Sequence, residues 1–116
     1  MTMSVLLNAP QQASSLLRSE DVEQNFQDLA LCWRRETALQ SSVTAIAMHP
    51  AYQQIIGMGD RALPLIFREL RREPDHWFWA LGAITGENPV PDAHAGDLDA
   101  MTHDWLFWGE AHGHTR

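Results

Sequence analysis

The sequence predicts an all-α fold, a compact bundle of about four to five helices. Apolar residues recur at intervals of three and four along most of the chain, the spacing that places side chains on one face of a helix. No stretch alternates apolar and polar residues over a useful length, so no strand is predicted. The 116 residues suit a single domain.

The N-terminal part of the sequence divides at residue 19. Residues 1–18 are mixed in character and rich in Ser and Gln, which predicts a loosely ordered arm before one helical domain of residues 19–116. Ser19 is a predicted N-cap because acidic residues fill the turn that follows it. The helix that starts there is expected to run to about Leu39, with an apolar stripe of Val22, Phe26, Leu29 and Trp33.

Two shorter helical segments are expected next. The pair Ser41-Ser42 can cap a segment from Val43 to Met48, which ends before Pro50. Proline suits the first position of a new helical turn, so a further helix is predicted to start at Pro50 and to end at Gly57 or Gly59. Its apolar side is formed by Tyr52, Ile55 and Ile56.

The central part predicts a helix from Arg61 to Arg72 that is capped by Asp60. Pro64 falls in its first turn, where a missing N–H does limited harm. Pro74-Asp75 then supplies a break and the cap of the next helix. The buried stripe of the Arg61–Arg72 helix is expected to be Leu63, Ile66, Phe67 and Leu70.

Two helices complete the predicted bundle. Residues 76–85 are apolar on nearly all sides, which is typical of a central, buried helix, and Gly86 fits a left-handed stop. The following Pro-rich connection favours extended backbone. Gly96 or Asp97 is expected to start a last helix, which Gly113 ends. Its periodic apolar residues are Leu98, Met101, Trp105 and Trp108.

Part of this region resembles a known repeat family. Residues 56–66 read IGMGDRALPLI and residues 79–84 read WALGAI, which together resemble one HEAT-type repeat over about residues 56–86. The resemblance implies an antiparallel helix pair and a bias toward protein binding, and it implies no catalytic residue. A longer block, from His49 to Gly109, resembles small uncharacterised bacterial proteins.

The charge balance argues against a nucleic-acid partner. Eight Arg and no Lys stand against fifteen acidic residues, for a net charge of −7. A nucleic-acid binder is expected to show a basic stripe, and the one local cluster, Arg68 with Arg71 and Arg72, is interleaved with Glu69 and Glu73. We interpret that cluster as a solvated helix face, and we expect no nucleic-acid partner.

The N-terminus and the apolar runs bear on location. No basic residue precedes the short apolar run Val5-Leu6-Leu7, so the layout of a signal peptide is missing. No run approaches the roughly 20 apolar residues of a membrane span. A cytoplasmic location without membrane association is therefore expected.

Catalytic and metal-binding patterns are weak. None of the six histidines is paired at i, i+4 within a predicted helix, so no metal site is expected. Cys32 falls inside a predicted helix, where a buried, inert thiol is favoured over a nucleophile. Gly57-x-Gly59 follows a helix and lacks the Lys of a phosphate loop, which favours a turn. We expect no enzyme and no cofactor.

Aromatic residues are the remaining feature, since five Trp occur in the chain. Trp79 lies beside Gly82 and Ala83 on a predicted helix, which leaves room for a second helix to approach. The last helix is apolar on more than one side, which fits either a Trp-rich core or a binding or dimer surface. The candidate protein-binding residues are Trp79, Trp105, Phe107 and Trp108, with Arg71 and Arg72 as a polar rim.

Two classes of function follow from these patterns. The preferred one is a small acidic regulatory module that binds a partner protein, or a second copy of itself, through an aromatic helical surface. An antitoxin-, immunity- or inhibitor-like role fits its size and charge. The alternative is a small hydrolase or metal-dependent enzyme whose His and Asp residues are assembled by folding. A polar pocket where His and acidic residues converge would favour the enzyme, and a flat apolar patch would favour the binding module.

Overall fold

The computed structural model describes residues 20–114, and the fold over these residues is all-α, as predicted. A first helix covers residues 20–36, and no strand occurs between residues 20 and 114. The arm predicted at residues 1–18 and the Ser19 cap lie outside the described residues. The remaining helices, slightly more numerous than expected, are α2 (Val43–Ala47), α3 (Pro50–Gly57), the 3-10 turn η1 (Gly59–Ala62), α4 (Leu63–Arg72), α5 (Phe78–Thr85), the 3-10 turn η2 (Asp92–His94) and α6 (Leu98–Ala111).

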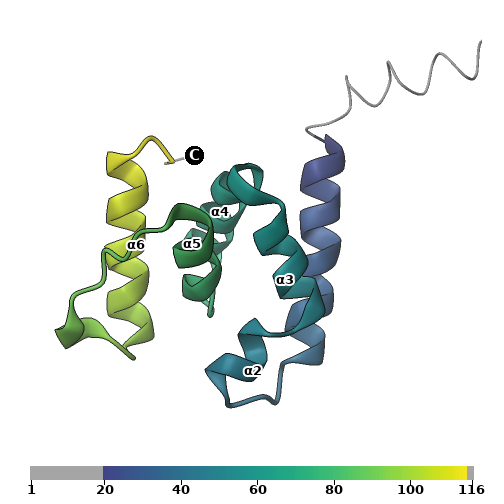
Figure 1. The fold of residues 1–116 in the computed structure, drawn as a ribbon, viewed down its shortest axis with the longest axis horizontal. Coiled ribbons are helices and arrows are strands. Elements are labelled where there is room, and N and C mark those ends of the chain that lie inside the picture. The colour runs from purple at the N-terminus through teal and green to yellow at the C-terminus, as the bar shows by residue number, and fades with distance from the viewer. Residues whose placement is uncertain (1–19, 115–116) are drawn as a thin grey trace, which may run out of the picture.

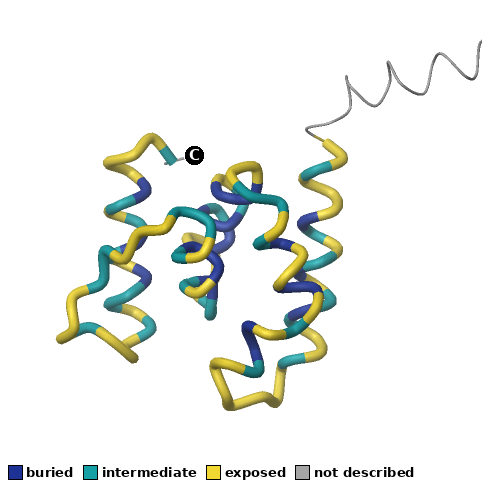
Figure 2. Tube along the Cα trace, in the orientation of Figure 1, coloured by how far each residue is buried: buried dark blue, intermediate teal, exposed yellow. Residues whose placement is uncertain are grey.

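Helix α5 occupies the middle of the bundle. It contacts α3 on one side and α4 and α6 on the others, while α6 and the helix at residues 20–36 form the two outer walls (Figure 1). Among the helices, α4 carries the most buried residues, and the connections at residues 38–44 and 86–97 are largely exposed (Figure 2). Within residues 20–114, no helix combines the length and the apolar character that crossing a bilayer requires.

An aromatic cluster around Trp77 joins the N-terminal helix to α3 and α5. The Trp77 ring centroid lies 4.6 Å from that of Trp33, 5.6 Å from that of Phe26 and 6.0 Å from that of Tyr52. All four side chains are almost completely buried. Aromatic pairs at these separations add to the free energy gained by burying their area, by about 0.5–1.5 kcal/mol per pair. Phe26 and Trp33, which belong to the predicted apolar stripe of the first helix, therefore pack in a core that this helix shares with α3 and α5.

Helix α5 begins later than predicted, and its cap comes from another helix. Its first residue is Phe78, not His76, and it has no capping side chain of its own. The Tyr52 hydroxyl on α3 accepts a hydrogen bond from the Ala80 N–H at 2.9 Å and donates one to the His76 carbonyl oxygen at 2.9 Å. Burial raises the pKa of this phenol, so it stays protonated and can keep both bonds.

Asp75, the predicted cap of α5, has a different role. Its carboxylate accepts a hydrogen bond from the His76 N–H at 2.7 Å and lies 3.6 Å from the Arg34 Nε. The prediction that Asp75 caps this helix was wrong because the chain makes one more bend before Phe78. Asp60 likewise falls within η1, which precedes α4, and no capping side chain precedes α4.

Other local predictions are confirmed. The Ser42 hydroxyl accepts from the Ala45 N–H at 3.2 Å, and the Asp97 carboxylate accepts from the Ala100 N–H at 3.1 Å, so both act as N-caps. Gly86 ends α5 with a φ of 73°, a left-handed conformation that favours glycine. The buried stripe of α4 is the predicted one: Leu63, Ile66, Phe67 and Leu70.

Glu69 contradicts the interpretation of α4 as carrying a solvated basic and acidic face. Its side chain is 1% exposed and accepts hydrogen bonds from the Arg34 guanidinium at 2.9 Å and from the Arg72 guanidinium at 2.7 Å. A buried carboxylate needs such partners because its desolvation is costly. Glu69 therefore ties α4 to the N-terminal helix, and the spacing of charges along α4 alone did not reveal it.

Helices α4 and α6 meet where α6 carries a glycine. Gly109 is buried, and a Cβ atom on it would lie 2.9 Å from the Phe67 Cε1. Phe67 is itself fully buried, so its ring has little room to retreat. The absence of a side chain at residue 109 allows this close approach.

We expect Gly109→Ala to lower the free energy of unfolding by about 1–3 kcal/mol, because the added methyl group overpacks against Phe67. Gly57→Ala is the matched control, since Gly57 ends α3 and a methyl group there would meet no atom within 4 Å. That control should leave stability unchanged or raise it by up to about 1 kcal/mol. Urea denaturation measures both, and equal stability of the two variants would contradict the close packing.

We expect Tyr52→Phe to destabilise the chain by about 1–3 kcal/mol, since the Ala80 N–H and the His76 carbonyl lose their partner. Amide exchange at the start of α5 should accelerate more than exchange within α6. Urea denaturation and hydrogen exchange check the two effects. A loss of less than about 0.5 kcal/mol, the size of an ordinary surface change, would show that the hydroxyl is not needed to cap α5.

Candidate functional site: an apolar cleft beside Trp79

An apolar cleft of about 580 Å³ opens between α2, α5, the connection at residues 86–97 and α6. Its volume falls within the range of roughly 300–1,000 Å³ that is common for binding sites. The lining side chains come from segments far apart in the sequence. They are Val43, Ala47, His76, Phe78, Trp79, Gly82, Ala83, Glu87, Asn88, Val90, Gly96, Leu98, Met101 and Trp105.

The α5 side of the cleft follows from helical geometry. Successive residues turn by about 100°, so Trp77 and Trp79 point to opposite sides of α5. Trp77 is fully buried in the aromatic cluster, whereas Trp79 lines the cleft and is 44% exposed. Gly82 and Ala83 lie one turn further along the same side, and their small side chains leave the space next to Trp79 open.

The α6 side is formed by Leu98, Met101 and Trp105, at the i, i+3 and i+7 positions of one helical face. The Asp97 cap fixes the start of this helix, directly beside Leu98. Trp105 is only 2% exposed, so it forms the floor of the cleft and also belongs to the core. Val90, from the connection between α5 and α6, is half-buried and contributes a further apolar wall.

Few polar groups face the cleft. Asn88 uses its side-chain oxygen to accept from the Val90 N–H at 3.2 Å, so it stabilises the connection. The His76 carbonyl is already bonded to Tyr52, and Glu87 is exposed. Such a lining can bury apolar groups of an occupant, and it offers one carboxylate and one imidazole for polar contacts.

The candidate protein-binding residues fall into three places. Trp79 and Trp105 line the cleft, as the exposed edge and the buried floor respectively. Phe107 is 72% exposed on α6 but does not line the cleft. Trp108 is half-buried against Phe67 on α4, with ring centroids 6.3 Å apart. The structure therefore does not bring the aromatic residues of α6 onto one surface.

The arginines of the predicted polar rim lie elsewhere. Arg71 and Arg72 are exposed in the last turn of α4 and are absent from the lining of the cleft. Arg72 bonds to the buried Glu69 and so has a structural role.

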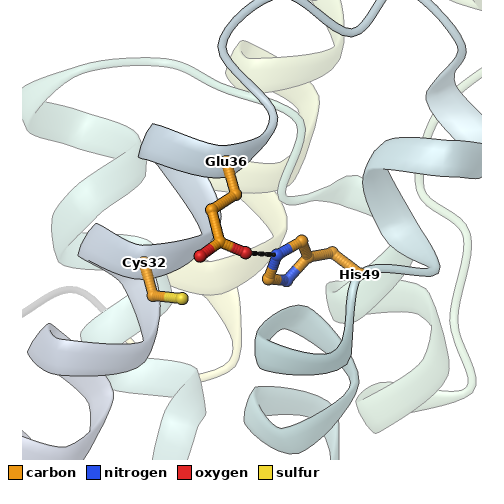
Figure 3. A group of neighbouring side chains, drawn as sticks. All are labelled: Cys32, Glu36 and His49. Atoms are coloured by element: carbon orange, nitrogen blue, oxygen red, sulfur yellow. Dashed lines mark hydrogen bonds and ion pairs between the residues drawn. The ribbon is translucent and has the colours of Figure 1, made fainter.

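A second cluster joins the first helix to the start of α3. Cys32 and Glu36 lie one turn apart on the helix at residues 20–36, and both side chains point toward His49 (Figure 3). The His49 Nε2 lies 2.7 Å from the Glu36 Oε1. Within residues 20–114, these three residues form the one set of three or more His, Cys, Asp or Glu ligands whose atoms all lie within 4.8 Å of one another. The Cys32-x₃-Glu36 spacing was visible in the sequence, but the approach of His49 depends on the fold.

Hydrogen bonding fixes the state of this cluster. The His49 Nδ1 accepts from the Ala51 N–H at 3.0 Å and so caps α3. A neutral imidazole carries one proton, which must then sit on Nε2 and be donated to Glu36. A metal ion on Nε2 would need that proton moved to Nδ1, where it would break the cap. The three residues have the donor atoms for Zn²⁺, yet their present hydrogen bonds compete with it.

The thiol of Cys32 is not activated for nucleophilic attack. Burial, a hydrogen bond to Glu36 and the Glu36 charge all raise its pKa, and the weaker opposing effect of Arg35 does not reverse this. The pKa of Glu36 is lowered, first by its hydrogen bond with His49 and then by the one with Cys32. The Glu36–His49 contact therefore persists to more acidic pH than a free carboxylate would allow.

The remaining histidines that the structure describes are not part of this cluster. His94 Nδ1 lies 2.7 Å from the Asp104 Oδ2, which ties η2 to α6. The His112 ring stacks on Trp108 with centroids 4.0 Å apart, and its Nδ1 lies 2.8 Å from the Trp108 carbonyl oxygen. The first contact joins two elements of the fold, and the second packs the end of α6 against its own last turn.

Comparisons of the chain with protein-family models, with curated proteins and with solved structures found no match. The resemblance of residues 56–86 to a HEAT-type repeat therefore stays a prediction. The region corresponds to η1, α4 and α5, of which α4 and α5 are in contact.

We expect Glu36→Gln to increase the rate at which Cys32 reacts with a thiol reagent near pH 8, because loss of the carboxylate charge lowers the thiol pKa. The pH profile of the rate should move to lower pH, since the thiolate is the reactive form. Asp28→Asn is the control, because Asp28 lies four residues before Cys32 and does not shift the thiol pKa. Stopped-flow measurement with a disulfide reagent checks this, and equal rates in both variants would contradict it.

Proposed function

We propose that the chain is a small acidic protein-binding module that receives apolar side chains of a partner protein in the cleft beside Trp79. The observation that carries this proposal is a large, half-exposed tryptophan at the edge of an apolar cleft. Tryptophan is enriched among the residues that dominate binding energy at protein interfaces, typically where it can fill or border a pocket.

The surroundings of the cleft favour a protein over a small molecule. Val43 lines the same cleft and is 50% exposed, so the apolar surface continues outward from α5 to α2. A small ligand would cover the inner part and leave this outer surface in water. A segment of a protein can cover both, which is the arrangement found at the centre and the rim of an interface.

The wider role that fits this module is regulatory. A net charge of −7 on 116 residues suits association with a basic partner, as in an antitoxin-, immunity- or inhibitor-like protein. The enzyme alternative, a His and Asp site assembled by folding, has one such pair in His94 and Asp104, which lies outside the cleft lining. A second candidate for that alternative is the Cys32, Glu36 and His49 cluster. The protonated thiol and the capping role of His49 oppose it, because neither group is free to act as nucleophile or base.

We expect Trp79→Ala to weaken partner binding by about thirtyfold or more, the effect of removing an interface hot spot, with little loss of stability. Phe107→Ala is the matched control, because Phe107 is a more exposed aromatic residue outside the cleft. Size exclusion with light scattering, using proteins encoded beside its gene, identifies the partner, and calorimetry then compares the variants. Loss of binding in Phe107→Ala but not in Trp79→Ala would contradict the proposed site.

A further inference from the structure

The acidic residues of this chain are unevenly distributed. All Arg residues that the structure describes precede residue 73, and residues 73–114 contain no Lys or Arg. The part of the chain that supplies most of the cleft is therefore purely anionic among its Asp, Glu, Lys and Arg residues. Its eight acidic residues are Glu73, Asp75, Glu87, Asp92, Asp97, Asp99, Asp104 and Glu110.

One of these acids lines the cleft, and a second is flanked in the chain by two residues that line it. Glu87 lines it and is exposed. Asp97 is exposed between Gly96 and Leu98, which both line the cleft, and it uses one oxygen to cap α6. Neither carboxylate forms a salt bridge within residues 20–114.

None of the arginines between residues 20 and 114 lines the cleft. Arg34 binds Glu69 and lies near Asp75, while Arg72 also binds Glu69. Arg68 pairs with Glu23 on the first helix at 2.8 Å. Arg34, Arg68 and Arg72 thus pair with acids that do not line the cleft. No arginine between residues 20 and 114 pairs with Glu87 or Asp97, so the negative charge there is left for an occupant to balance.

We propose that the occupant of the cleft is an amphipathic, cationic segment of the partner protein, with apolar side chains in the cleft and Lys or Arg opposite Glu87 and Asp97. This inference rests on the proposed function and specifies its partner. Apolar contact beside Trp79 supplies affinity. The charges at the rim attract a cationic segment and select against an acidic one, which would be repelled there. Anionic lipid headgroups and nucleic acids are disfavoured for the same reason.

A set of designed peptides tests this proposal. The probe is a helix-forming peptide of about 15 residues with Leu on one face and Lys on the other. One matched peptide has Gln in place of every Lys, and another has the composition of the Lys peptide in scrambled order. Isothermal titration calorimetry of the full chain with each peptide, at low and at high salt, measures affinity.

The Lys peptide should bind at least about threefold more tightly than the Gln peptide at low salt, and salt should reduce this difference. The scrambled peptide should bind more weakly than the Lys peptide, since its apolar side chains do not share a face. Glu87→Gln combined with Asp97→Asn should remove most of the preference for Lys, and Asn preserves the cap of α6. Glu110→Gln is the control, because Glu110 is an exposed acid on α6 that does not line the cleft.

The outcomes separate the two proposals. If Trp79→Ala weakens the binding of both the Lys and the Gln peptide, but these two peptides bind the unmodified chain with equal affinity, the cationic partner is excluded and the binding cleft stands. If the Lys preference persists in the double variant and falls in Glu110→Gln, the charge acts through the whole surface and the proposed rim is wrong. If Trp79→Ala leaves the affinity for both the Lys and the Gln peptide unchanged, both the proposed partner and the proposed function are wrong.

Discussion

The hydroxyl of Tyr52 is the contact on which the arrangement of α5, and with it the cleft, depends. It links the first turn of α5 to α3 by accepting from Ala80 and donating to the carbonyl of His76. Its ring meanwhile stacks on Trp77, so one side chain fixes both the start and the rotation of α5. A helix of eight residues has little stability of its own, and tertiary contacts of this kind hold it in place.

The rotation of α5 decides which tryptophan is structural and which is available for binding. With Trp77 held among Phe26, Trp33 and Tyr52, the neighbouring Trp79 must face the opposite side. Helix α6 lies on that opposite side. Its residue Trp105 forms the floor of the cleft but does not reach the exposed edge. The cleft is therefore a consequence of core packing, and the same packing of Trp77 explains why Trp79 is exposed at its edge.

Local signals predicted much of the fold and little of the site. The caps at Ser42 and Asp97 and the left-handed Gly86 depend on neighbours within three or four residues, so the sequence alone was enough to place them. The start of α5 was misplaced because its capping group is a tyrosine on another helix. The burial of Glu69 was missed for a similar reason, since Arg34 lies 35 residues away in the chain.

The candidate site likewise combines a feature that local sequence predicted with features that depend on distant parts of the chain. Trp79 beside Gly82 and Ala83 signalled an open side of α5, and that pattern is local to one helix. The walls from α2, α6 and residues 86–97 come together only in the fold, so the sequence could not show that Trp79 borders a cleft while Phe107 does not. Arg71 and Arg72 were placed at the rim from their charge alone, and the position of α4 puts them outside the cleft lining.

The use of polar groups in this fold argues for binding over catalysis. His49 caps α3 and binds Glu36, His94 binds Asp104, and Glu69 is enclosed by two arginines. A general base or metal ligand must have a lone pair free for its substrate or ion. His49 and Glu69 already share theirs with the protein, and His94, whose second ring nitrogen stays outside its contact with Asp104, does not line the cleft. The side chains that line the cleft and remain available to a partner include the indole of Trp79, the imidazole of His76, several aliphatic groups and the carboxylate of Glu87. That combination supplies apolar contact and negative charge, which fits the binding module proposed above.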